Sequence, residues 1–228
     1  MEKQSICIIL PAFNEEPNIG KVIAEIPRQE LEKAGYRVDI VVVDGNSMDR
    51  TRQIAQESGV QVIVEPRRGK GRAVRTALGM VKADYIFMLD ADYTYPATYI
   101  LDMLTILNDS QVVIGSRLKG KREKGAMRQF NLVGNYGLTF LANILYRTHI
   151  SDLCTGYWGF RGEVIGKINL VTDGFQLEAE LLTQLAKKGY RIAEIPIYYR
   201  CREGKGKLNG LRDGSKIAWM LVKSRFRF

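Results

Sequence analysis

The sequence has 228 residues, enough for one well-filled domain and too few for two, and it carries a formal net charge of +9. Its 3 cysteines are scattered without a CxxC pair, and His149 is its only histidine, so a disulfide framework and a zinc site are excluded. Because no stretch has the ~20 apolar residues of a membrane span or the pattern of a signal peptide, we expect a cytosolic protein with reduced thiols.

The first half of the chain alternates short apolar strands with helices. We expect strands at residues 5–10, 38–43, 60–65 and 85–89, and helices at residues 17–33, 47–59 and 69–82. This alternation is typical of βαβ units, and it predicts an α/β fold with a mostly parallel sheet between flanking helices.

Polar loops follow the first, second and fourth of these strands. The carboxyl ends of parallel strands meet at one edge of a sheet, so we expect these loops to line one crevice. The residues concerned are Asn14, Glu15, Asp44, Asn46, Asp90 and Asp92. Asp90 and Asp92 directly follow a buried strand, and such a pair of carboxylates suits Mg²⁺ or Mn²⁺, which would hold a phosphorylated ligand. A solvated turn is the alternative.

Two glycine-containing segments do not predict NAD binding. The loop after the first strand reads PAFNEE in place of GxGxxG, so no glycine turn brings a pyrophosphate onto a helix. Gly69 and Gly71 follow a different strand and lack the third glycine. We expect them to form a close turn near a sugar or phosphate, and a simple helix start is the alternative.

The second half is predicted to continue with a helix at residues 97–107, a strand at 111–115, a short strand within 152–161, a helix at 175–188 and a long strand at 191–202. The uncharged stretch 130–146 is expected to be mostly a buried core helix, although the cationic residues before it also permit a position beside lipid head groups. A final basic, amphipathic helix at about 211–225 either packs on the domain or contacts a membrane surface.

Positive charge is concentrated in this second half. Residues 200–228 hold nine Lys and Arg against two acidic residues, and residues 117–128 hold six against one. The division predicts an anionic partner that contacts the second half, and a solvated basic surface is the alternative. Nucleic acid is not expected as this partner, because the chain has an acidic crevice and lacks an RNP-type aromatic signature.

Nine segments in this order resemble family 2 glycosyltransferases, and more narrowly the dolichol-phosphate mannose synthase group of polyprenyl-phosphate sugar transferases. They are PAFNEEPNI, VVVDGNSMDRT, RRGKGRAVRTAL, LDADYTYP, GSR, DLCTGYWGFR, FQLEAELL, EIPIYYR and GKGKL. The resemblance implies a GT-A type nucleotide-sugar-binding domain over residues 1–208. Residues 209–228 would form the C-terminal helix, as part of the same domain or as a membrane-surface contact.

The resemblance also implies roles for individual residues. Nucleotide-sugar binding is implied for Pro11, Ala12, Asn14, Glu15, Asp44, Asn46, Lys70, Asp90 and Lys207. Asp90 and Asp92 would hold Mg²⁺ or Mn²⁺, with Thr94 where a metal-contacting Gln is often found. Arg117 and Arg128 would face the acceptor phosphate. The catalytic residues would be Asp92, Arg117 and Arg202. Arg202 and Lys207 match a basic loop that closes over the diphosphate.

These residues suit inverting transfer of a hexosyl group from a nucleotide diphosphate sugar to a polyprenyl (dolichyl) monophosphate. A phosphate monoester has its second pKa near ~6, so it is ionised at pH 7 and needs no general base. Mannose from GDP-mannose is the expected donor, with UDP-glucose and UDP-N-acetylglucosamine as alternatives. A family 2 transferase acting on a glycan hydroxyl would need a base, and Asp152 is the candidate for it.

A polyprenyl chain lies in a bilayer, so we expect the protein to work peripherally on the cytoplasmic face of a membrane. Attraction of the basic second half to anionic head groups, about 1 kcal/mol per Lys or Arg near the surface, would hold it there. The alternative is a small membrane-embedded subunit that anchors it.

Overall fold

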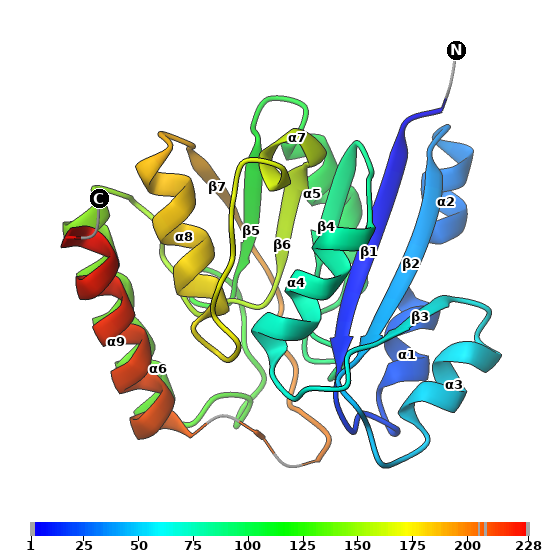
Figure 1. The fold of residues 1–228 in the computed structure, drawn as a ribbon, viewed down its shortest axis with the longest axis horizontal. Helices are drawn as coiled ribbons and strands as arrows, with labels where there is room; N and C mark the ends of the chain where they lie inside the picture. The colour runs from blue at the N-terminus through cyan, green and yellow to red at the C-terminus, as the bar shows by residue number, and fades with distance from the viewer. Residues whose placement is uncertain (1–2, 205, 208, 227–228) are drawn as a thin grey trace.

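A computed structural model of the chain describes residues 3–204, 206–207 and 209–226, so Lys205 and Leu208 of the GKGKL segment lie outside the described residues. Within them the centre is a seven-stranded sheet in the order β3-β2-β1-β4-β6-β5-β7 (Figure 1). The strands are β1 (Ser5–Ala12), β2 (Arg37–Asp44), β3 (Gln61–Val64), β4 (Tyr85–Met88), β5 (Val112–Ser116), β6 (Trp158–Arg161) and β7 (Ile192–Pro196). Only β6 runs antiparallel to its neighbours among these strands.

Helices cover both faces of the sheet. One face packs against α1 (Ile19–Glu25), α2 (Arg28–Lys33), α3 (Thr51–Glu57) and α5 (Ile100–Ile106), which follows the short 3-10 helix η1 (Ala97–Tyr99). The other packs against α4 (Lys70–Met80), α7 (Gly162–Ile165) and α8 (Leu177–Lys187). Beyond α8, α6 (Gln129–Tyr146) and α9 (Gly210–Phe226) lie side by side at the edge of the molecule (Figure 1).

The central strands are apolar along their whole length because both of their faces are buried. In β1, Ile6, Ile8 and Leu10 pack towards α1, whereas Cys7 and Ile9 pack towards α4. Consecutive residues of a strand point to opposite faces, so a strand covered on both sides has no polar positions in its middle. All four strands of the first half lie close to their predicted positions.

Two expected elements are wrong in their extent. The helix predicted at residues 17–33 is two helices, because Pro27 has no amide hydrogen to donate and Ile26 before it is extended, with φ −62° and ψ 125°. The strand predicted at 191–202 ends at Pro196. Beyond it the chain crosses the carboxyl edge of the sheet, where the Arg200 amide donates to the Thr94 carbonyl over 2.9 Å. The short strand expected within residues 152–161 is present as β6, at its C-terminal end.

The expectation that residues 130–146 form a mostly buried core helix is also wrong. The fully buried side chains of α6 are Asn135, Thr139 and Ala142. Its outer face exposes Phe130, Val133, Tyr136, Phe140 and Ile144, each by 51% or more. The helix stands at the end of the layer and packs on α8 and α9 from one side only. No helix in the described part of the chain is long and apolar enough to cross a membrane.

Candidate active site

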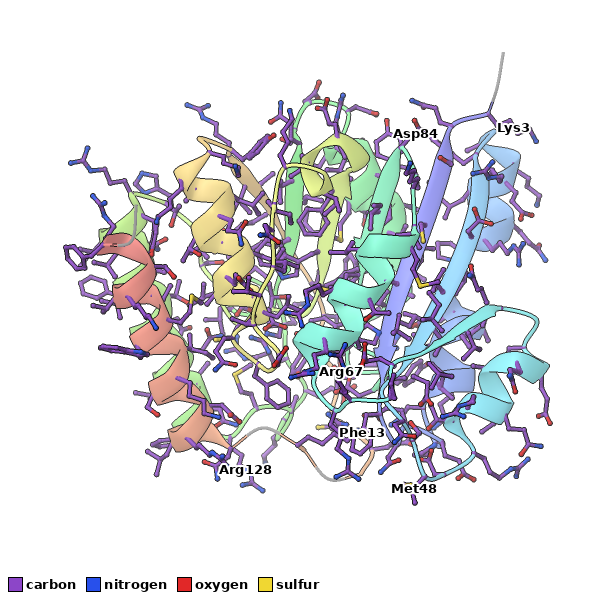
Figure 2. The ribbon with its side chains drawn as sticks, in the orientation of Figure 1. Lys3, Phe13, Met48, Arg67, Asp84 and Arg128 are labelled. Carbon is purple, nitrogen blue, oxygen red and sulfur yellow. The ribbon has the colours of Figure 1, made fainter. Side chains whose placement is uncertain are left out.

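The loops after β1 and β2 meet at the carboxyl edge of the sheet, as predicted. Figure 2 shows Phe13, Met48 and Arg128 along this edge, with Lys3 and Asp84 at the opposite one. The Asn14 amide donates to Ser47 Oγ over 2.9 Å, and the Met48 amide donates to Asn14 Oδ1 over 2.9 Å. These bonds fix the two loops to each other.

Two asparagines of these loops take left-handed backbone conformations. The φ angles of Asn14 and Asn46 are 49° and 65°, a region that asparagine tolerates better than most residues. Both side chains are exposed. Ala12 is buried at the end of β1, and its carbonyl accepts a 2.8 Å hydrogen bond from the amide of Gly45. Pro11, beside it, is half-buried.

Asp44 is fully buried at the end of β2 and braces its own loop. Its carboxylate accepts from the Ser47 amide over 3.1 Å and from Nε and Nη2 of Arg52 over 2.9 and 2.7 Å. Arg52 was not predicted from the sequence. Its place eight residues after Asp44, in the first turn of the next helix, could have indicated a partner for Asp44.

Asp90, after β4, is held between Lys70 and Gly156. Lys70 Nζ forms an ion pair with Asp90 Oδ1 and a second one with Glu178 Oε1 at 2.6 Å. A Cβ atom at residue 156 would collide with the Asp90 carboxylate, so a larger residue here would displace Asp90 from this position. Glu178 is the main residue of this cluster that sequence reasoning missed, because 108 residues separate it from Lys70.

Asp92 is buried and accepts hydrogen bonds through both oxygens. Thr94 donates to Oδ1 from its hydroxyl over 2.6 Å and from its amide over 3.2 Å, and Arg202 Nη1 donates to Oδ2 over 2.8 Å. Burial raises the pKa of Asp92, the nearby charge of Asp90 raises it further, and Arg202 opposes both effects. Thr94, in the place of the Gln common in the resembling family, therefore fixes the orientation of Asp92.

The donor set of this pair fits a hard divalent cation. The charge of Asp90 makes Asp92 harder to ionise, and both carboxylates are paired with cations here, Lys70 and Arg202. A divalent cation favours oxygen ligands and would stabilise the ionised form of both carboxylates. Among the described residues, no group of three or more His, Cys, Asp or Glu side chains is placed to hold a metal. Asp90 and Asp92 offer carboxylate oxygens, the ligand type that such a cation prefers.

Glu15 joins the loop after β1 to the loop after β7. It is 5% exposed, and its Oε1 pairs with Arg202 Nη2 and, over 2.6 Å, with Lys207 Nζ. Its Oε2 accepts from Nδ2 of the fully buried Asn18 over 3.0 Å. Arg202 and Lys207 thus lie beside the acidic residues, as the resemblance implied for a basic loop, while Glu15 is occupied by that loop.

Arg117 and Asp152 form a buried ion pair. Arg117 donates to the Asp152 carboxylate from its amide over 3.0 Å, from Nε over 2.8 Å and from Nη2 over 2.7 Å, and Asn135 Nδ2 of α6 donates over 2.6 Å. Burial alone would raise the pKa of Asp152, but Arg117 outweighs it and the pKa is lowered. A carboxylate so occupied is a poor general base, which counts against the role considered for Asp152 from the sequence.

Arg117 keeps one nitrogen for another contact. Its Nη1 makes no hydrogen bond within the described part of the chain, and its guanidinium carbon lies 5.3 Å from the centre of the Tyr199 ring. Arg128 is exposed at the start of α6, on the same edge of the molecule (Figure 2). The structure therefore puts Arg128 on the predicted edge without bringing it into contact with the Arg117 ion pair.

Gly69 and Gly71 serve packing between chain segments. A Cβ atom on either residue would collide with a backbone carbonyl, that of Asp173 or of Thr172 respectively. The two glycines thus form the expected close turn, packed beside residues 172–173, which lead into α8, and its place near a sugar or phosphate stays a prediction. The turn still places Lys70 next to Asp90.

Comparison with known proteins agrees with this geometry. Residues 7–168 match the model of the family described as "Glycosyl transferase family 2". The chain is 36% identical over 221 residues to a dolichyl-phosphate hexose transferase of Haloferax volcanii, covering 96% of this chain and 92% of that protein. It is also 36% identical over 217 residues to glycosyltransferase AglJ of the same organism, covering 93% of this chain and 69% of that one.

Solved structures share the fold at lower identity. Glucosyl-3-phosphoglycerate synthase from Mycobacterium tuberculosis, in complex with Mn²⁺, uridine diphosphate and glucosyl-3-phosphoglycerate, superimposes with a TM-score of 0.71 at 20% identity. The match covers 97% of this chain and 78% of that one. The fold is therefore that of GT-A glycosyltransferases.

Proposed function

Because the chain belongs to glycosyl transferase family 2, we propose that it transfers a hexosyl group, with inversion, from a nucleotide diphosphate sugar to the monophosphate of dolichol or another polyprenol. The similarity to a dolichyl-phosphate hexose transferase extends over nearly the whole length of both proteins. It supports a phosphorylated lipid as acceptor, and the arrangement of charges at the carboxyl edge supports it independently.

One observation carries the choice of acceptor. The carboxylate that could have served a hydroxyl acceptor, Asp152, is buried and bound by Arg117 and Asn135. A hydroxyl nucleophile must lose its proton to a base during attack, whereas a phosphate monoester is already ionised at pH 7. This site has a fixed arginine that attracts anions, and its neighbouring carboxylate is hydrogen-bonded and so does not act as a base. It therefore suits an anionic nucleophile.

On the acceptor side, Arg117 and Arg128 would bind the lipid phosphate. Arg117 is oriented by two parallel hydrogen bonds to Asp152, which leaves Nη1 to donate to a phosphate oxygen. Arg128, exposed on the same edge, would neutralise a second charge of the phosphate. Both arginines would lower the repulsion between acceptor and donor.

On the donor side, Asp90 and Asp92 would hold Mg²⁺ or Mn²⁺, which when bound neutralises charge on the departing diphosphate. The solved neighbour in complex with uridine diphosphate also contains Mn²⁺. Arg202 and Lys207 would turn from Glu15 and Asp92 to the diphosphate and stabilise its negative charge. Asn14 and Asn46, exposed at the ends of β1 and β2, would contact the nucleoside, and the buried Asp44 would hold their loop in place.

The outer faces of α6 and α9 would place the protein on the cytoplasmic face of a membrane. The exposed apolar side chains of α9 are Leu211, Trp219, Val222 and Phe226, and they lie among Lys and Arg residues. α9 packs beside α6, whose own outer face is apolar (Figure 1). Aromatic and basic residues on one surface suit the boundary between head groups and acyl chains. A small membrane-embedded subunit could occupy the same face instead.

The acceptor can be tested directly. The full chain with Mn²⁺ is incubated with radiolabelled GDP-mannose, UDP-glucose or UDP-N-acetylglucosamine, each with a short polyprenyl phosphate or, as matched control, the corresponding polyprenol. We expect label in organic solvent only with the phosphate, and the donor that gives it identifies the sugar. Transfer to polyprenol at a comparable rate would contradict the proposal, because a hydroxyl acceptor needs a base.

A further inference from the structure

We propose that Lys70 is a built-in counter-ion of Asp90 that a divalent cation must displace, and that Glu178 is the site that receives the displaced ammonium group. The inference rests on the proposed function, in which Asp90 and Asp92 hold the metal. It assigns to Glu178 a positioning role that acts through Lys70.

Lys70 is shared between two carboxylates. Its Nζ pairs with Asp90 Oδ1 and with Glu178 Oε1, and its side chain is only 13% exposed. Burial alone would lower the pKa of Lys70, but the charges of Asp90 and Glu178 outweigh burial and raise it, so the ammonium group is charged. A divalent cation on Asp90 would repel this group at close range. Lys70 must then leave Asp90 without leaving its charge buried and unpaired.

Glu178 provides the second partner. Its side chain is 8% exposed, and Oε1 already accepts from Lys70. Its burial raises its pKa and Lys70 opposes that effect, so the ammonium group favours the ionised carboxylate. When Lys70 shifts wholly to Glu178, both charges remain paired and Asp90 is released to the metal.

The backbone around this pair is fixed. Glu180 of α8 accepts from the amides of Val171 and Thr172 over 2.9 Å each, and the same segment packs against Gly69 and Gly71 at the start of α4. On the α4 side, Asp173 pairs with Arg72 and Arg75 over 2.5 and 2.9 Å. Lys70 and Glu178 thus extend from two helices that are clamped together, and their relation does not depend on a mobile segment.

Arg202 makes a useful contrast. It pairs with Asp92 and would also have to move before a metal binds, but it lies on the loop after β7 and its side chain is 23% exposed. A loop arginine can turn towards solvent or a diphosphate. Lys70, on a buried helix start, can change partner only locally, and Glu178 is the other acidic side chain with which it pairs in the described structure.

The test is a titration of Mn²⁺ alone into the full chain, with free Mn²⁺ measured by electron paramagnetic resonance. Lys70→Gln keeps a donor to Glu178 but removes the competing charge, and we expect it to tighten Mn²⁺ binding about tenfold. Glu178→Gln confines Lys70 to Asp90 and should weaken binding about fivefold. Because Glu178 acts through Lys70, the double variant should bind Mn²⁺ like Lys70→Gln. Circular dichroism checks that each variant is folded.

The controls separate displacement of Lys70 from a general change in net charge. Lys21→Met removes a lysine that pairs with Glu203 at the same edge, and it measures the effect of net charge alone, which should be small. Two results would overturn the inference while leaving the metal site in place. In the first, Lys70→Gln changes Mn²⁺ binding no more than Lys21→Met does. In the second, Glu178→Gln weakens Mn²⁺ binding fivefold in the Lys70→Gln background as well. Binding to the wild type no tighter than to an Asp90→Asn, Asp92→Asn variant would overturn both this inference and the proposed metal site.

Discussion

The proposed acceptor and donor sides of the candidate site hold their arginine side chains in different ways. On the acceptor side, Arg117 is fixed by a buried carboxylate that belongs to the framework, and Asn135 of α6 fixes that carboxylate in turn. On the donor side, Arg202 comes from the loop after β7 and pairs with Glu15 and Asp92, residues it would leave when ligands bind. Acceptor binding would therefore be preorganised, whereas donor binding would exchange one set of ion pairs for another.

The largest effect is expected on the donor side, from Asp92→Asn. One negative charge of the proposed metal site is lost while shape and the bond from Thr94 are kept, so kcat should fall on the order of 10³-fold, as several kcal/mol of charge stabilisation disappear. Steady-state transfer to polyprenyl phosphate measures it. Asp109→Asn, a substitution at an exposed position, is the control and should keep full activity. Metal-dependent transfer by Asp92→Asn at the normal rate would remove Asp92 from the site.

Asp152→Asn tests the preorganised side. It leaves the buried Arg117 without its counter-charge, so we expect a loss of about 3–5 kcal/mol in the free energy of unfolding and about 10² in kcat. Urea unfolding and transfer assays measure the two effects. The pKa of Asp152 is lowered in the folded state, so its stabilisation is present above the unfolded pKa of about 3.9 and is lost as the pH falls through the lower folded pKa. The stability difference from wild type should therefore shrink below about pH 4. A difference that instead grew with acid would contradict the ion pair.

Arg202→Gln removes a cation that a loop holds on the donor side. We expect about a tenfold fall in kcat and a change in unfolding free energy well below that of Asp152→Asn, since Glu15 keeps Lys207 and Asn18 as partners. Transfer assays and urea unfolding again measure the two effects. If the two variants destabilised the protein equally, the distinction between a framework cation and a loop cation would fail.

The smallest effect is expected at the proposed membrane face. Phe140 and Trp219 are 68% and 65% exposed, and replacing both by Ser should reduce partitioning onto anionic vesicles about fivefold without changing transfer to a short, water-soluble polyprenyl phosphate. Vesicle sedimentation measures the partitioning. Met80→Ser, at a residue of α4 that is 64% exposed, is the matched control and should bind vesicles normally. Unchanged binding by the double variant would place the membrane contact elsewhere.

The parts of the molecule that were predictable from sequence are those fixed by local pattern. The runs that became β1, β2 and β4 are mainly apolar because most of their residues are buried, and strand direction then brings Asp44, Asp90 and Asp92 to one edge. The basic loop beside these carboxylates was expected from the resemblance, and Arg202 and Lys207 lie there.

The parts that were not predictable depend on which segments approach in space. Glu178 reaches Lys70 only because α8 packs beside α4 through residues 172–173, and no pattern along the chain records that contact. The pairing of Arg117 with Asp152 likewise joins segments far apart in the sequence, and no pattern along the chain records it. For α6, the absence of charge suggested burial, but an apolar face without charge also suits a helix that is covered on one side only.

The proposed function requires that the acceptor arrives already ionised and that no protein base activates it. This requirement is tested by the pH dependence of kcat/KM for a polyprenyl phosphate and for the corresponding phosphonate, whose second pKa is higher. We expect kcat/KM for the phosphate to rise through about pH 6 and then level off, and the midpoint for the phosphonate to move up with its own pKa. A midpoint that stayed the same for both acceptors would show that a group of the protein titrates, and it would contradict attack by a pre-ionised phosphate.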